Sequence, residues 1–134
     1  MRWPHISNRR RGPLAAAAAL VATALVVTAC GGSDDVSTED CTTVEPDSDG
    51  RTVLEVGAES LDFDFDCIEV QAGTVHITFD NRDSGVAHNL RVAGQATDLK
   101  AGPVVQELTV ELDVGDHDVR CDPHPNMKAV IVAA

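Results

Sequence analysis

From about residue 52 onward, apolar and polar residues alternate along the chain with a period of two, as in β-strands that bury one face. The alternation is clearest at Val75, Ile77 and Phe79, which polar residues separate. Glycine, Asp and Asn clusters interrupt it and indicate turns. The predicted strands cover residues 52–56, 63–66, 68–70, 74–80, 88–92, 104–112, 117–121 and 128–133. No stretch after residue 50 keeps a helical period over three turns, so the pattern predicts an all-β sandwich or barrel of seven to eight strands.

The first thirty residues have the pattern of an export signal. Arg9-Arg10-Arg11 precedes sixteen uncharged residues, Leu14 to Ala29. This run is short for a membrane-spanning helix, which needs about 20 residues, and matches the apolar core of a secretory signal. The sequence Val27-Thr28-Ala29-Cys30-Gly31 resembles a bacterial lipobox, which implies cleavage before Cys30 and lipid modification of that cysteine. The alternative is cleavage elsewhere, with Cys30 an ordinary thiol, and both the general secretory and the twin-arginine export routes stay open.

The segment that follows the export signal is small, polar and acidic. It has no apolar period and cannot bury enough apolar surface to offset the entropy of ordering it. The sequence therefore predicts three parts: a lipoprotein signal peptide at residues 1–29, a flexible acidic tether with lipidated Cys30 at 30–50, and a folded domain at 51–134. Such a protein is expected at the extracytoplasmic face of the cell membrane, held by its lipid anchor.

The charge of the 134-residue chain narrows its possible partners. The formal net charge is −12, and four of the ten cationic side chains precede residue 12. A chain that starts near residue 30 carries 6 cationic against 22 acidic side chains, a net charge of −16. Such a surface repels phosphate backbones, so we expect no nucleic-acid partner. Aromatic residues make up 3% of the chain, which also argues against stacking on bases or sugars.

Four cysteines, at positions 30, 41, 67 and 121, must be accounted for in an oxidising compartment. If Cys30 carries lipid, three remain, and an odd number in an exported protein requires an explanation. The simplest assignment is a Cys41–Cys67 disulfide with Cys121 left as a free thiol that has a function. The alternative is that Cys41 and Cys67 are unpaired, with Cys67 simply buried.

The free thiol lies in a run of possible metal ligands, Cys121-Asp122-Pro123-His124-Pro125-Asn126-Met127. Thiolate and thioether sulfur select soft metals, and imidazole suits copper or zinc. Pro123 and Pro125 restrict the backbone on both sides of His124. A second histidine, His88, precedes Asn89 at the start of a predicted strand. In a β-sandwich the turn before His88 and the 121–127 loop can reach the same end, and two His, one Cys and a weak Met form the ligand set of a blue-copper site.

These segments resemble the cupredoxin, or blue copper, family, and most of all its amicyanin and plastocyanin-like members. The resemblance rests on Asn81-x₆-His88-Asn89 and on Cys121-x₂-His124-x₂-Met127, and it covers residues 52–134. It implies a Greek-key β-sandwich with one type 1 copper site. His88, Cys121 and His124 are then the strong ligands and Met127 the axial one. Asn89 is implied to join the two ligand loops, with Asn81, Pro123 and Pro125 supporting the site.

The implied function is electron transfer between extracytoplasmic redox proteins that bind only transiently. With four protein ligands the copper has no open position for a substrate, so an enzyme is not expected. The protein is expected to be a monomer. Two other hypotheses stay open. The same residues could capture copper and deliver it to an acceptor protein, or the domain could be a metal-free binding module that kept the fold. Met-rich or His-rich tracts, which would favour delivery, are absent from the sequence.

Overall fold

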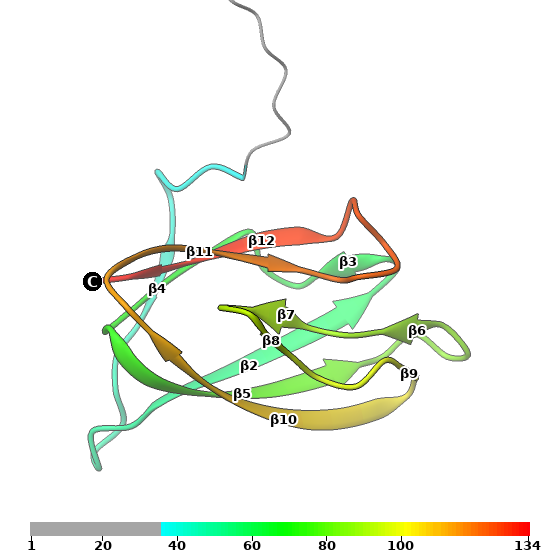
Figure 1. The fold of residues 1–134 in the computed structure, drawn as a ribbon, viewed down its shortest axis with the longest axis horizontal. Coiled ribbons are helices and arrows are strands. Elements are labelled where there is room, and N and C mark those ends of the chain that lie inside the picture. Colours follow the sequence, from blue (N-terminus) through cyan, green and yellow to red (C-terminus); the bar gives the residue numbers. More distant parts are fainter. Residues whose placement is uncertain (1–35) are drawn as a thin grey trace, which may run out of the picture. The chain divides into compact units, whose positions relative to one another are not determined.

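The computed structural model describes residues 36–134 as a β-sandwich (Figure 1). Its strands are β1 (Thr42–Val44), β2 (Thr52–Glu59), β3 (Asp62–Phe63), β4 (Cys67–Val70), β5 (Gly73–Asn81), β6 (Ala87–His88), β7 (Arg91–Val92), β8 (Gln95–Ala96), β9 (Lys100–Ala101), β10 (Val104–Leu112), β11 (Gly115–Arg120) and β12 (Lys128–Ala133). One sheet has the order β1-β4-β12-β11-β7-β8 and the other β10-β5-β2-β3, while β6 pairs only with β9. The predicted all-β sandwich is confirmed, with several strands of only two residues.

The sheets contain parallel as well as antiparallel pairs. Strand β2 runs parallel to β5, and β4 runs parallel to β12 and to β1, whereas β10/β5 and β11/β12 are antiparallel. Because parallel neighbours cannot be joined by a tight hairpin, the chain crosses between the sheets. Figure 1 shows that β6 and the loop between β11 and β12 lie at the same end of the sandwich. The topology thus brings together two segments that are far apart in the sequence.

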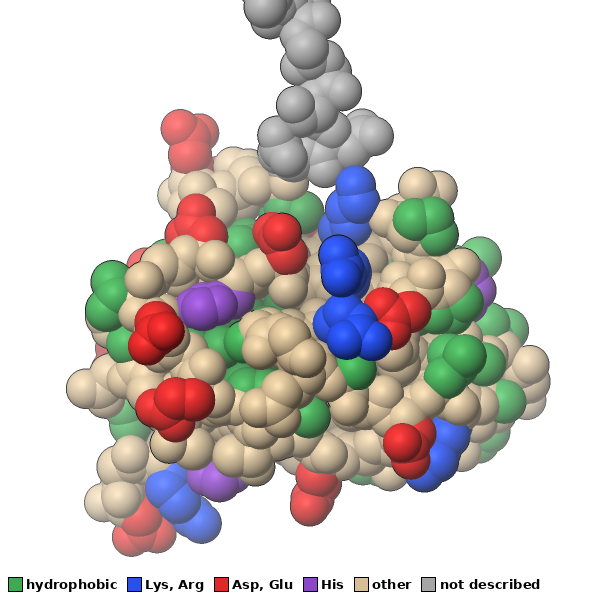
Figure 2. Space-filling view, in the orientation of Figure 1, with side chains coloured by type: hydrophobic (Ala, Val, Ile, Leu, Met, Phe, Trp, Pro, Cys, Tyr) green, Lys and Arg blue, Asp and Glu red, His purple; other side chains and the backbone are tan. Residues whose placement is uncertain are grey.

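The outward faces of the strands are polar, as the alternation requires. In β5 the exposed or half-buried Thr74, His76 and Thr78 alternate with the buried Val75 and Ile77. Figure 2 shows acidic side chains spread over the visible face of the domain, with a row of cationic side chains near its centre and other cationic side chains at its lower edge. His76, which the sequence places on the solvent face, is exposed and lies 3.1 Å from Thr109 Oγ1 through its Nδ1 atom.

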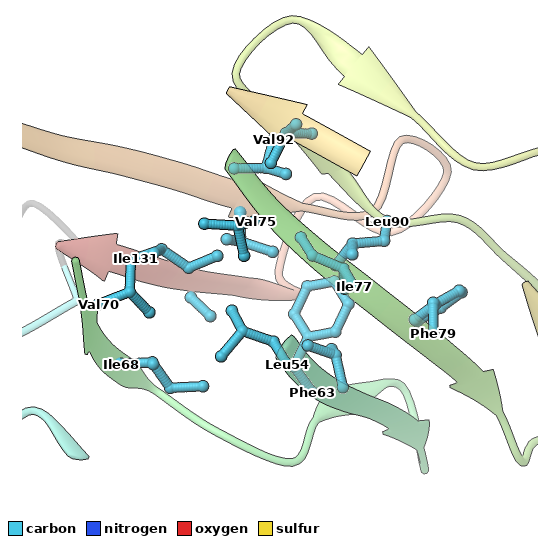
Figure 3. Close-up of a cluster of buried hydrophobic side chains, with 14 of the residues drawn as sticks. Leu54, Phe63, Ile68, Val70, Val75, Ile77, Phe79, Leu90, Val92 and Ile131 are labelled. Atoms are coloured by element: carbon cyan, nitrogen blue, oxygen red, sulfur yellow. The ribbon is translucent and has the colours of Figure 1, made fainter. Parts of the chain in front are cut away.

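The inward faces form one hydrophobic core between the two sheets (Figure 3). Leu54, Val75 and Ile77 come from the four-stranded sheet, and Val70 and Ile131 come from the six-stranded one; each is at most 2% exposed. Burying a side chain of this size stabilises the fold by about 1.5–3 kcal/mol. This core fixes both sheets, and hence the two loops that they carry at one end.

Cys41 and Cys67 form a disulfide, which confirms the predicted pairing, and Cys121 is a buried free cysteine. The bond holds β1 beside β4, where Thr42 pairs with Ile68. A turn at Asp47 then leads into β2: the Asp47 carboxylate accepts hydrogen bonds from the amides of Asp49 and Arg51. The disulfide and the ladder to β4 therefore hold residues 41–44, which fall within the segment predicted as a tether, beside the six-stranded sheet.

The predicted signal peptide and the lipidated Cys30 lie outside the described residues and stay predictions. Within residues 36–134, no helix is long and apolar enough to cross a membrane.

Candidate metal centre

Three of the four predicted ligands converge at one end of the sandwich. The Nδ1 atoms of His88 and His124 are 3.0 Å apart, and the Cys121 Sγ lies 3.6 Å from the first and 3.5 Å from the second. Donors that share one ion at roughly 2.0–2.3 Å lie about 3–4 Å apart. The three donor atoms therefore fit around one metal ion without moving the backbone.

The chemistry of these donors favours a soft or borderline metal. One thiolate and two imidazole nitrogens in a trigonal arrangement are the strong ligands of a blue-copper site. His88 and Met127 are 0% exposed and Cys121 is 1% exposed, whereas His124 is half-buried. Met127, the predicted axial ligand, is thus buried at the end of the loop that carries Cys121 and His124. The site is closed to solvent except at the His124 ring.

The loop between β11 and β12 is closed by its own backbone. The Met127 amide donates to the His124 carbonyl at 2.9 Å, and the Cys121 amide donates to the Met127 carbonyl at 3.3 Å. Pro123 and Pro125, predicted to support the site, are exposed on both sides of His124. Because proline fixes φ, these two residues reduce the freedom of the loop on either side of the ligand. The spacing of Cys121, His124 and Met127 therefore gives one short, closed turn.

Asn81 holds the other ligand segment through hydrogen bonds to residues that are not themselves predicted ligands. This fully buried residue donates through Nδ2 to the carbonyls of Val86 and Lys100, both at 2.9 Å. Its Oδ1 accepts the Asp83 amide at 3.0 Å. The side chain thus fastens the turn between β5 and β6 to β9. Gly102 makes this packing possible, since a Cβ there would lie 2.8 Å from the Asn81 Oδ1.

Asp83 orients the His88 ring, a role that sequence reasoning missed. Its Oδ2 lies 2.8 Å from His88 Nε2, and because a carboxylate only accepts, Nε2 carries the proton and Nδ1 keeps its lone pair for a metal. The same carboxylate accepts the amides of Ser60 and Leu61 at 2.8 and 3.1 Å. The Ser60 amide, then His88 and the Leu61 amide, lower the pKa of Asp83.

Asn89 joins the two ligand loops as the resemblance implied, but through an unexpected partner. Its Nδ2 donates to Asp122 Oδ2 at 2.7 Å, and its Oδ1 accepts the Asp122 amide at 2.9 Å. Arg91 completes the group with two 2.7 Å hydrogen bonds to the Asp122 carboxylate. Arg91, followed by Asn89, lowers the pKa of Asp122 to about 2. Adjacency to the ligands was the only sequence signal for Arg91 and Asp122.

The Cys121 thiol has a pKa above its ordinary value, mainly because burial disfavours the charged form. The backbone amides of Asn89 and His124 partly oppose this effect by donating toward the sulfur. A bound cation would displace the thiol proton and hold the sulfur as a thiolate. His117 shares strand parity with Val119 and Cys121, which predicts a hydrogen-bonded core histidine and not a ligand. It is hydrogen-bonded, with Nε2 2.7 Å from the Asp113 carbonyl, but it is only half-buried and does not belong to the core.

The fold is cupredoxin-like, and solved structures of that kind match it. Auracyanin from the photosynthetic bacterium Roseiflexus castenholzii is 21% identical, with a TM-score of 0.57 over 62% of this chain and 97% of that chain. Auracyanin A from Chloroflexus aurantiacus, described as a "blue" copper protein, is 22% identical, with a TM-score of 0.56 over 63% and 100%. Amicyanin from Paracoccus versutus is 18% identical, with a TM-score of 0.51 over 61% and 81%. No protein-family model and no curated protein sequence matches the chain.

Proposed function

We propose that this protein is a type 1 copper protein that carries single electrons between extracytoplasmic redox proteins while anchored to the membrane. The observation that carries the proposal is the set of 3.0–3.6 Å distances among His88 Nδ1, Cys121 Sγ and His124 Nδ1. A copper ion held there would supply one-electron Cu(I)/Cu(II) chemistry. The likeness to auracyanin and amicyanin structures supports the fold that such a site requires.

The residues around the site keep it rigid, which suits electron transfer. The Asp83 carboxylate fixes the His88 ring, and the Asn89–Asp122 pair joins the segment of His88 to that of Cys121. Ligands that stay in place when the charge of the ion changes keep the reorganisation small, since preorganised dipoles need not rearrange. The half-buried His124 is the ligand through which a partner would exchange electrons.

The burial of three of the four proposed copper ligands favours electron transfer over copper delivery. Delivery requires an acceptor's ligands to reach the ion, whereas His88, Cys121 and Met127 are at most 1% exposed. The buried site also leaves no position for a substrate, which supports a carrier and not an enzyme.

The partners are expected to bind transiently over a small area, as redox partners do. We expect the protein to act as a monomer at the extracytoplasmic membrane surface, held by lipid on Cys30.

Optical spectroscopy of the chain after Cu(II) addition tests this proposal. We expect an intense blue colour from thiolate-to-copper charge transfer, and reversible bleaching on reduction. The Cys121→Ser variant should bind Cu(II) without the blue band, while the matched Ser37→Ala variant should keep it, because Ser37 is exposed in the N-terminal segment. A colourless Cu(II) complex of the unmodified chain would refute the proposal.

A further inference from the structure

Cationic side chains form a row across the outer face of the six-stranded sheet. Arg91 on β7 lies directly opposite Arg120 on β11, and Arg120 lies directly opposite Lys128 on β12. Residues 36–134 contain six lysines and arginines against 20 acidic residues, so half of the cations lie in this row. Figure 2 shows the gathered cationic side chains among scattered acidic ones.

Two members of the row form no salt bridge with an acidic residue of the described part of the chain, residues 36–134. Among the described residues, Arg51 pairs with Asp47, Arg82 with Asp64 and Asp80, Lys100 with Asp98, and Arg91 with Asp122. Arg120 and Lys128, by contrast, form no salt bridge within residues 36–134, and both are exposed; after Arg91, Arg120 helps to lower the pKa of Asp122 only through its longer-range charge. Like charges directly opposite on neighbouring strands destabilise a sheet. The domain keeps an unfavourable pair here although it is rich in carboxylates.

The row borders a cleft that reaches the ligand loop. The cleft has a volume of ≈ 690 Å³, and its lining includes Arg120, Cys121, Asp122, Pro125 and Lys128. Arg120 is bonded directly to Cys121, the sulfur ligand of the proposed site. An anionic group that enters the cleft therefore lies beside the loop that carries Cys121 and His124.

We propose that the row Arg91–Arg120–Lys128 is the docking surface for a carboxylate-rich face of an electron-transfer partner protein. This inference rests on the proposed function and names the partner's chemistry. Charge complementarity carries it: the partner's carboxylates supply salt-bridge partners that Arg120 and Lys128 do not find within residues 36–134. A protein fits better than an anionic bilayer, because Asp116 and Asp118 also line the cleft and would face a uniformly negative surface. A partner protein can place polar or cationic groups opposite those two residues.

A paramagnetic anion maps the surface without any electron transfer. Hexacyanochromate(III) is added to the ¹⁵N-labelled, copper(I)-loaded full chain, and broadening of each amide signal is measured. We expect broadening centred on Arg120 and Lys128 that is lost in the Arg120→Glu/Lys128→Glu variant. The Arg51→Glu/Lys100→Glu variant changes the net charge equally and should keep it. Broadening that is absent, or centred on Arg51 or Lys100, would overturn the proposal even if the copper site is blue.

Rates of electron exchange with small charged reagents provide a second test of the proposed docking surface. The reduced chain is oxidised with hexacyanoferrate(III) and with the cationic tris(phenanthroline)cobalt(III). We expect Arg120→Glu/Lys128→Glu to slow the anionic reagent at least tenfold at low salt, while Arg51→Glu/Lys100→Glu slows it less than threefold. Equal slowing by both variants would overturn the proposal. The blue spectrum of each variant reports separately whether the copper site itself is intact.

Bilayers of defined composition distinguish a lipid surface from a protein partner. The full chain is reconstituted into phosphatidylcholine nanodiscs with and without phosphatidylglycerol, and hexacyanochromate(III) broadening is measured again. We expect Arg120 and Lys128 to stay equally accessible in both. Protection of these two residues only when phosphatidylglycerol is present would assign the row to lipid headgroups and overturn a protein partner.

Discussion

The His88 imidazole and the Asp83 carboxylate, five residues apart, are joined by a hydrogen bond of 2.8 Å between Nε2 and Oδ2. The same carboxylate accepts the amides of Ser60 and Leu61, both of which have positive φ in the turn between β2 and β3. This turn therefore anchors the residue that orients His88, a proposed metal ligand. The orientation of His88 depends on a contact more than twenty residues away in the sequence.

Replacement of Asp83 by Asn should weaken copper binding about 10–100-fold, the usual effect of losing the partner of a metal-ligating histidine. The amide cannot accept all three hydrogen bonds, so the His88 ring loses its fixed orientation. Competition with a chromophoric Cu(I) chelator measures the affinity. Asp98→Asn, which removes only a surface pair with Lys100, is the control and should leave the affinity unchanged. An Asp83→Asn affinity within twofold of the unmodified chain would contradict the assignment.

Arg91 and Asp122 should change the reduction potential in opposite directions. Arg91→Gln leaves the Asp122 negative charge uncompensated beside Cys121, which favours Cu(II) and lowers the potential. Asp122→Asn removes that charge and raises the potential. Cyclic voltammetry measures both, and Arg51→Gln, which breaks an ion pair with Asp47, should leave the potential unchanged. Shifts of the same sign in the two variants would show that the pair acts only by holding the loop in place.

The Cys41–Cys67 disulfide should stabilise the domain without tuning the metal site. Closing a loop with a sequence separation of 26 contributes about 3.5 kcal/mol on the chain-entropy model. A Cys41→Ser/Cys67→Ser variant should lose about that much free energy of unfolding in guanidinium titrations. Its blue spectrum should be unchanged, because the bond joins the N-terminal segment to β4 and contacts no ligand. Loss of the blue band in this variant would show instead that β1 supports the copper loop.

Met127→Leu tests the axial position. Leucine nearly conserves the volume of the fully buried side chain, so the free energy of unfolding should fall by less than about 1.5 kcal/mol. Loss of the weak sulfur donor removes a ligand that favours Cu(II), so the reduction potential should rise. An unchanged potential in voltammetry, with an intact blue band, would mean that Met127 serves only as core packing.

The parts of the fold that could be predicted are those with local signals. Alternation placed Val75, Ile77 and Phe79 on the buried face of β5, and the spacing of Cys121, His124 and Met127 defined one short loop. The position of His88 could not be predicted from a local pattern alone. Its residue type and the family resemblance suggested that it is a ligand, and the sheet topology brings it close to Cys121. The signals for β5 and for the loop of residues 121–127 thus lie within a few positions of the residues that they place.

The parts that could not be predicted depend on contacts between distant segments. Asp83 becomes a partner of His88 only because the Ser60–Leu61 turn lies beside it. Arg91 reaches Asp122 because β7 pairs with β11, a register that no local pattern encodes. Strand β1 has no apolar alternation, and the disulfide beside it, together with pairing to β4, orders it.

Copper K-edge X-ray absorption of the copper-loaded chain tests the central claim most directly, because it counts the atoms bound to the ion. The account predicts one short copper–sulfur bond and two copper–nitrogen bonds in both oxidation states, with little change between them. Cys121→Ser should lose the short sulfur contact while keeping the nitrogen ligands. A spectrum of the unmodified chain that shows only nitrogen and oxygen ligands would contradict the claim that Cys121, His88 and His124 hold one copper ion.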